Sequence, residues 1–246
     1  MFLFYVNPIL IAAAVIPAIV LLRFVYREDR LDKESPGMLL SLVLFGILAT
    51  FGALIAEQIG ESVLALLVPP YTRAYNAILY FVVVALSEEG FKYLLLKKRT
   101  WWSREFNCQF DGVVYAVFVS LGFALWENIS YVAMYGLGTA AVRAVTAIPG
   151  HACFGVFMGA FYGLAKRYDH FGDEYRSRRC RRLAVWVPVV LHGCYDYIAT
   201  YEYDGYAWIF VGFVVLLFAA AYRMIKRLAR DDRFIDGGRD GDLIQK

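Results

Sequence analysis

Long apolar runs separated by short polar segments dominate the hydrophobic pattern of this chain. Crossing the bilayer core of about 30 Å takes roughly 20 apolar residues in helical form. Runs long enough for this cover residues 3–22, 38–56, 76–96, 113–134, 139–165, 183–201 and 207–222. Residues 59–70 form a shorter apolar segment, which we expect to lie in the interface or to re-enter the membrane. The pattern predicts an all-α bundle of about seven transmembrane helices.

The composition agrees with a membrane protein. Hydrophobic residues make up 60% of the 246 residues, whereas soluble domains contain roughly 45–50% apolar residues. We expect one integral membrane domain over residues 1–222. The tail over 223–246 is basic and polar and is predicted to be disordered. We therefore expect a multi-pass protein of the cell membrane that is surrounded by the lipid bilayer and has no nucleic-acid partner.

The basic residues predict the orientation of the bundle. Lys and Arg gather in alternate polar segments, which are residues 23–37, 97–112, 166–182 and 223–246. Short loops rich in Lys and Arg stay on the cytoplasmic side of a membrane. The N-terminus is therefore predicted to lie outside, and the C-terminus in the cytoplasm.

Ionisable side chains inside the expected spans are the exception to the apolar pattern. A charge near the bilayer centre costs about 2.5–3.5 kcal/mol or more, so such residues are functional by default. They are Glu88, Glu89 and Lys92 in ALSEEGFKYLLL, Glu127 in GFALWENIS, His151 in IPGHACFG, and His192 and Asp196 in VLHGCYDY. The structural alternative is an ion pair of Lys92 with Glu88 or Glu89 that sets the helix register, together with hydrogen bonds between helices.

Depth and spacing are compatible with one site for these residues. At 1.5 Å per residue they fall within a layer about two turns thick, on the cytoplasmic side of the midplane. His192 and Asp196 are separated by four positions, which places two ligands on one helix face. Gly155, Gly159 and Gly163 follow His151 at small-xxx-small spacing, which predicts close helix packing.

Two kinds of hydrolytic chemistry suit this set. Two His and one carboxylate can hold a catalytic zinc ion, with a nearby Glu as general base. The candidate ligands are His151, His192 and either Glu127 or Asp196. Alternatively, the paired carboxylates Glu88 and Glu89 activate water without a metal.

The motifs E-E-x-x-K (SEEGFK), F-x-x-x-E (FALWE), H-x-x-x-G (GHACFG) and H-x-x-x-D (HGCYD), in this order on successive spans, resemble those of the PrsW family of intramembrane proteases. That family is related to the superfamily of CAAX prenyl endopeptidases. The resemblance covers about residues 75–200. It implies Glu88 and Glu89 as the catalytic carboxylates beside Lys92, with Glu127, His151, His192 and Asp196 completing the site.

The resemblance also implies a class of substrate. Its members are associated with regulated cleavage of membrane-anchored anti-sigma factors, so we expect an endopeptidase acting on such a protein. In the prenyl endopeptidases the position of Glu127 is usually His. This difference makes CAAX cleavage a poorer expectation, and both the Zn²⁺-dependent and the metal-free glutamate mechanism stay open.

Two other function classes use the same residues. A proton-coupled transporter or channel could employ the carboxylates as a relay, although the chain shows no inverted repeat. A haem protein could use His151 and His192 as axial ligands. The gathering of two His with a carboxylate cluster favours the protease.

Overall fold

Apart from one β-bridge, between Cys108 and Phe234, helices make up the regular structure of the described residues. The computed structural model describes residues 8–70, 72–200 and 204–237. In chain order the elements are α1 (Pro8–Glu28), α2 (Pro36–Leu67), α3 (Arg73–Ile78), the π-helical segment η1 (Leu79–Ala85), α4 (Leu86–Thr100), α5 (Asp111–Tyr135), α6 (Leu137–Val145), α7 (Ala147–His170), α8 (Glu174–Ala199) and α9 (Asp204–Arg230). The predicted all-α fold is confirmed for these residues.

Five helical stretches of the described chain are long and apolar enough to cross a membrane. They are Pro8–Glu28, Pro36–Leu67, Asp111–Tyr135, Leu137–His170 and Tyr206–Arg230. The other two expected spans, 76–96 and 183–201, are helical wherever they are described, but charged side chains interrupt or precede their apolar runs. The chain is a multi-pass membrane protein. Which end faces the cytoplasm stays a prediction.

Helix α2 is longer than the sequence pattern predicted. It continues to Leu67, so residues 59–70 do not form a separate interfacial or re-entrant segment. The first helix-breaking residues in this region are Pro69 and the proline after it. Gly60 packs against Val83 of η1, which holds the added turns of α2 on the bundle.

The expected span 139–165 is divided between two helices. Gly136, with φ of 81°, separates α5 from α6 in the left-handed region that favours glycine. A second break falls at Thr146, with φ of −122° and ψ of −74°. Pro149 follows in the first turn of α7, where a helix tolerates the missing N–H. His151 therefore lies near the start of α7, beside this break.

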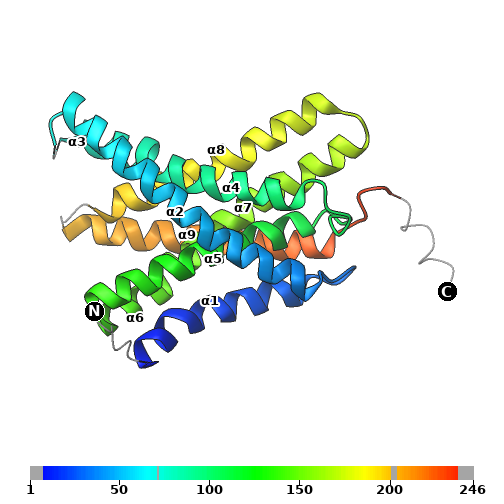
Figure 1. Ribbon diagram of the computed structural model, residues 1–246, viewed down its shortest axis with the longest axis horizontal. Helices are drawn as coiled ribbons and strands as arrows, with labels where there is room; N and C mark the ends of the chain where they lie inside the picture. Colours follow the sequence, from blue (N-terminus) through cyan, green and yellow to red (C-terminus); the bar gives the residue numbers. More distant parts are fainter. Residues whose placement is uncertain (1–7, 71, 201–203, 238–246) are drawn as a thin grey trace, which may run out of the picture.

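Helix α5 lies at the centre of the bundle (Figure 1), and its first half is buried almost completely. Gly112 of α5 and Gly159 of α7 meet backbone to backbone, so a Cβ atom on either glycine would clash with the other helix. On α5, Gly122 lies equally close to the backbone of Val43 in α2. The predicted close packing of the small residues of α7 is confirmed. It brings α2, α5 and α7 near enough for their side chains to share one site.

The basic turns gather at one end of the bundle. Figure 1 shows the α1–α2, α4–α5 and α7–α8 turns on the same side as the end of α9. We call this side, formed by residues 23–37, 97–112, 166–182 and 223–237, the basic end. Much of the segment 166–182 is helical there, because α7 continues to His170 and α8 begins at Glu174.

Residues 223–237 differ from the disordered tail that the sequence predicted. Helix α9 continues to Arg230, and the chain beyond it pairs with the α4–α5 connection. The backbone N–H of Ile235 donates to the carbonyl of Asn107 at 2.7 Å. Ile235 is buried against the core, and the burial of this apolar side chain holds the segment in place. Residues 238–246 lie outside the described residues.

Candidate active site

The π-helical segment η1 ends three residues before the first glutamate of the acidic pair. It covers Leu79–Ala85, and α4 begins at the next residue. A π-helical turn shifts the helical register, and such turns recur at functional sites. Glu88 and Glu89 therefore lie in the first turn of α4, with Lys92 one turn further on. All three side chains are buried, and Glu89 and Lys92 are completely inaccessible.

Three acceptor atoms surround the ammonium group of Lys92. Its Nζ lies 3.0 Å from Oε2 of Glu88 and 2.8 Å from Oε1 of Glu89. The same Nζ lies 3.1 Å from Nδ1 of His151. An ammonium has three N–H donors, so each acceptor can take one. The ring of Phe123 packs against the group, with its centroid 4.0 Å from Nζ.

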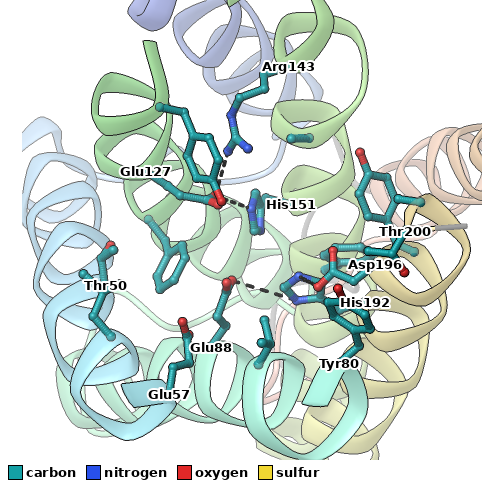
Figure 2. A pocket seen from close by; sticks show the side chains of 18 residues that line it. Thr50, Glu57, Tyr80, Glu88, Glu127, Arg143, His151, His192, Asp196 and Thr200 are labelled. Carbon is teal, nitrogen blue, oxygen red and sulfur yellow. Dashed lines mark hydrogen bonds and ion pairs between the residues drawn. The ribbon is translucent and has the colours of Figure 1, made fainter. Parts of the chain in front are cut away.

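His151 links this cluster to α5. Its Nε2 lies 2.9 Å from Oε2 of Glu127, while its Nδ1 faces Lys92. Because an ammonium only donates and an ionised carboxylate only accepts, this network corresponds to a neutral ring that carries its hydrogen on Nε2. Nη2 of Arg143 lies 2.9 Å from the same oxygen of Glu127. Figure 2 shows Glu127 held by both partners.

His192 lies between two carboxylates from different helices. Its Nδ1 is 3.0 Å from Oε1 of Glu89, and its Nε2 is 3.3 Å from Oδ2 of Asp196. The rings of His192 and His151 are 5.4 Å apart between centroids. The zinc ligands considered from the sequence are thus divided into two pairs, His151 with Glu127 and His192 with Asp196.

A cavity of about 410 Å³ lies between these groups. Figure 2 shows side chains of several helices converging on it. Of the residues singled out from the sequence, its wall contains Glu88, Glu127, His151, His192 and Asp196. Glu89 and Lys92 lie one layer behind the wall, where they contact Glu88 or the histidines. All of the sequence-predicted residues therefore meet at one place.

The cavity extends away from the basic end, reaching Thr200 at the end of α8. The sequence predicts a layer on the cytoplasmic side of the membrane midplane, and this depth stays a prediction. The helices continue far into the basic segments. Helix α4 runs about 18 Å beyond Glu88 to Thr100, and α7 runs about 28 Å beyond His151 to His170.

Two charged residues of the cavity wall were not among the sequence candidates. Glu57 of α2 lines the cavity, but the expected span 38–56 ended one residue before it. Arg143 of α6 was assigned to a span end, although it is one of the few basic residues outside the basic segments. That isolation was the available signal for Arg143. For Glu57 the signal was the uninterrupted helical pattern beyond residue 56.

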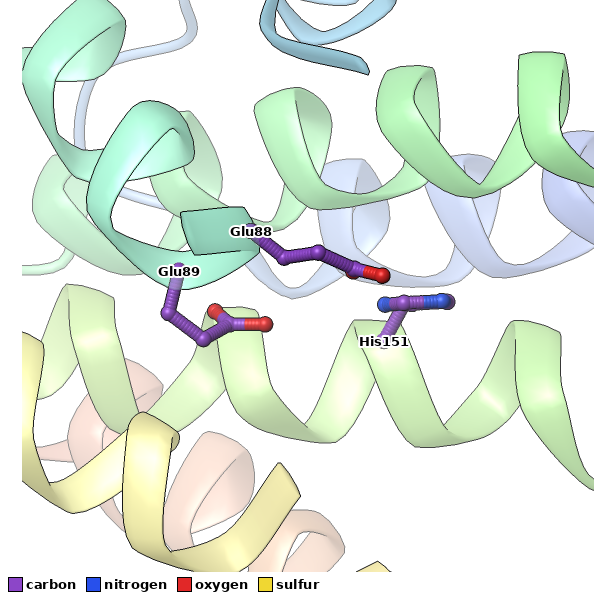
Figure 3. Close-up of side chains that lie close together, drawn as sticks. All are labelled: Glu88, Glu89 and His151. Atoms are coloured by element: carbon purple, nitrogen blue, oxygen red, sulfur yellow. The ribbon is translucent and has the colours of Figure 1, made fainter. Parts of the chain in front are cut away.

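One group of metal-ligating side chains is compact enough to hold an ion in the described part of the chain. It consists of Glu88, Glu89 and His151, whose candidate ligand atoms lie within 4.8 Å of one another. Figure 3 shows Glu88 and His151 pointing toward one another from α4 and α7. Three protein donors match a catalytic zinc site, and Oε2 of Glu89 has no hydrogen-bond partner. The donor set fits a metal ion, which would compete with the ammonium of Lys92 for the same lone pairs.

Comparison with known proteins gives one consistent family. The profile of the PrsW family intramembrane metalloproteases matches residues 34–222. A protein named Protease PrsW from Geobacillus kaustophilus is 33% identical over 226 residues, covering 89% of this chain and 91% of that protein. Its namesake from Halalkalibacterium halodurans is 30% identical, over 91% of this chain and 99% of the relative. The Bacillus subtilis protein of the same name is 29% identical, over 89% and 94%. No solved structure matches the chain.

The matched region contains the buried acidic pair, Lys92, both histidines and the cavity between them. Family match, relatives and membrane-spanning helices agree with the resemblance carried by the four short motifs. This chain belongs to the PrsW family of intramembrane metalloproteases and is a protease.

Proposed function

We propose that this protease hydrolyses a peptide bond in a membrane-anchored protein of the anti-sigma-factor class, as one step of regulated intramembrane proteolysis. The observation that carries the proposal is the position of Glu88. Its carboxylate lies on the cavity wall while bonded to the buried ammonium of Lys92. A base in this position meets water on one side and a fixed positive charge on the other.

Glu88, and not Glu89, is the proposed general base. Glu89 is completely buried, is absent from the cavity wall and uses Oε1 to contact both Lys92 and His192. We assign it the role of positioning those two side chains. Oε2 of Glu88 accepts a hydrogen bond from Nζ of Lys92 at 3.0 Å, which fixes this carboxylate at the cavity wall.

In the proposed hydrolysis, Glu88 takes one proton from water and later returns that proton to the leaving group. Glu88 removes a proton from a cavity water as the water oxygen attacks the carbonyl carbon of the scissile bond. Arg143, whose guanidinium lies on the wall, is a cationic N–H donor placed to stabilise the developing oxyanion. Glu88 returns the proton to the leaving nitrogen as the C–N bond breaks.

The residues that would hold a metal ion are Glu88, Glu89 and His151. A divalent ion bound there supplies Lewis-acid polarisation of water or of the carbonyl oxygen. The hydrogen bond from His151 to Glu127 orients the ring, so that the lone pair of Nδ1 faces Lys92 within the group that also contains Glu88 and Glu89.

The test uses the full chain reconstituted with a single-span anti-sigma factor tagged at both ends. Glu88→Gln should lower the cleavage rate by at least about 100-fold, as loss of a general base does. The matched control is Glu61→Gln, which removes an exposed carboxylate from α2 outside the cavity wall and should cleave at the wild-type rate. Wild-type cleavage by Glu88→Gln would overturn the assignment of the base. An inactive wild type with a panel of such substrates would overturn the substrate class.

A further inference from the structure

A second pocket lies between α4 and α8 at the basic end, apart from the cavity of the active site. Its volume is about 340 Å³, and its wall contains Tyr93, Lys97, Arg178, Arg181, Arg182 and Trp186. Figure 1 shows α8 diverging from α4 toward the α7–α8 turn.

The charge on the wall is almost entirely positive. Arg178 is 3.6 Å from the carboxylate of Glu174. In the described parts of the chain no ion pair is made by Lys97, Arg181 or Arg182. Instead, the guanidinium of Arg181 lies over the ring of Trp101, 5.3 Å from its centroid. The pocket therefore holds several cations with one exposed carboxylate to balance them, and an anionic ligand would complete it.

Apolar surface adjoins these cations on both helices. Leu94 precedes Lys97 by about one turn and is 56% exposed. On α8, Trp186 and Val190 are 54% and 51% exposed, and they follow the arginines toward the middle of the helix. A phosphate ligand without a hydrophobic part would leave this surface uncovered. A phospholipid would cover both parts, with its phosphate on the cations and its acyl chains along the two helices.

We propose that this pocket binds the phosphate group of an anionic phospholipid from the leaflet at the basic end. Arginine forms bidentate hydrogen bonds with phosphate oxygens, and lysine adds a point charge. Basic pockets between membrane helices suit anionic headgroups. Trp186, on the wall beside the arginines, is of a residue type that is enriched at the headgroup level of membranes. This inference is independent of the proposed substrate and mechanism.

Native mass spectrometry of the full chain in detergent tests the proposal. Phosphatidylglycerol and phosphatidylcholine with identical acyl chains are titrated separately, and bound lipid is counted. We expect phosphatidylglycerol to bind about tenfold more tightly, because the cations attract its net charge. The double variant Lys97→Gln/Arg181→Gln should lose about tenfold in phosphatidylglycerol affinity.

A matched variant removes two charges from the same helices without changing the pocket wall. Lys98→Gln/Arg179→Gln replaces exposed neighbours that are absent from the wall and should bind phosphatidylglycerol as the wild type does. The charge-conserving pair Lys97→Arg/Arg181→Lys should also keep most of the affinity, which controls for misfolding. Equal losses in both glutamine pairs would overturn the pocket, because a diffuse surface charge would explain them.

Competition distinguishes the source of the anion. Inorganic phosphate at millimolar concentration and a hexaglutamate peptide are each added to the complex with phosphatidylglycerol. Neither should displace the lipid if the apolar surface contributes to binding. Displacement by phosphate would show a site for free anions, and displacement by the peptide would show a site for an acidic protein segment. Either result, or equal affinity for the two lipids, would overturn the lipid assignment.

Discussion

Nζ of Lys92 lies 3.1 Å from Nδ1 of His151, so a lysine of α4 occupies the point at which the donors of a metal site converge. Glu88 and Glu89 supply the other two acceptors. The ammonium of Lys92 thus has a partner for each of its three N–H groups. The same three partner residues could instead bind a metal ion. The side chains that neutralise each other in the buried ion-pair network are therefore also the proposed catalytic and metal-binding groups.

Removing the charge of Lys92 should destabilise the protein. Lys92→Met leaves two buried carboxylates without their cation, and breaking a buried pair in this way costs about 3–5 kcal/mol. The melting temperature in detergent should fall clearly below that of the wild type. Adding Glu89→Gln to Lys92→Met should restore part of the loss, because one of the uncompensated charges disappears. A variant Lys92→Met with wild-type melting would contradict the network.

Two sets of metal ligands can be distinguished by the metal content of variants. The structure favours a set that contains His151 without His192, whereas the sequence pattern suggested a set that contains both histidines. If the purified wild type contains about one zinc ion per chain, His151→Ala should lose it. His192→Ala should retain most of it, because His192 lies outside the compact ligand group and both of its nitrogens are turned to the carboxylates of Glu89 and Asp196. Elemental mass spectrometry of protein never exposed to chelator gives the answer. Loss of zinc in His192→Ala with retention in His151→Ala would favour the sequence-based set.

Glu127 should act on catalysis through His151. Glu127→Gln removes the carboxylate that accepts from Nε2 of His151, so the ring is no longer held in one tautomer. We expect kcat to fall about 10–100-fold, as it does for partners of ligating histidines. KM should change little. Ser130→Ala, one turn further along α5 on an exposed site, is the control and should retain wild-type kinetics. A change in KM alone would point to substrate contact instead.

The acidic residues of the α1–α2 connection predict a pH dependence at the basic end. Burial raises the pKa of Glu34 to about 8 and that of Asp29 to about 6. Nearby carboxylates, those of Glu105 and Asp232 among them, raise these pKa values further. Because the pKa values of Glu34 and Asp29 are higher in the folded protein, their stabilising contribution is largest at low pH. It is lost as the pH rises through about 6 and then about 8.

The expected result is a melting temperature that falls between pH 6 and pH 9. Glu34→Gln should flatten the upper part of this curve, since a neutral amide replaces the group that loses its proton. The protection factors of the backbone amides at residues 233–237, which compare the measured exchange rate with the intrinsic rate at each pH, should fall over the same range. A melting temperature that rises with pH in the wild type would contradict the assignment.

Several features were accessible from the amino-acid pattern because they depend on local chemistry. A charge within an apolar run is costly wherever the helix packs, so Glu88, Lys92 and His192 were identifiable without a structure. The role of Gly159 was also predictable, because small-xxx-small spacing acts through one helix face. The helix ends were less predictable. Basic residues near a span end are compatible with a loop or with a continued helix, and in α7 and α8 the helix continues.

Long-range packing decided the rest. Whether Glu88 or Glu89 meets the cavity depends on the π-helical turn of η1 and on the close contact of α5 with α7, which no local pattern reveals. The partners of the two histidines depend on helices that are distant in sequence. The amino-acid sequence therefore determined which ionisable side chains needed a polar or charged partner inside the membrane, because the cost of removing a charge from water is a property of each residue. Only the tertiary structure selected the partner of each charge, because pairing depends on distances between helices.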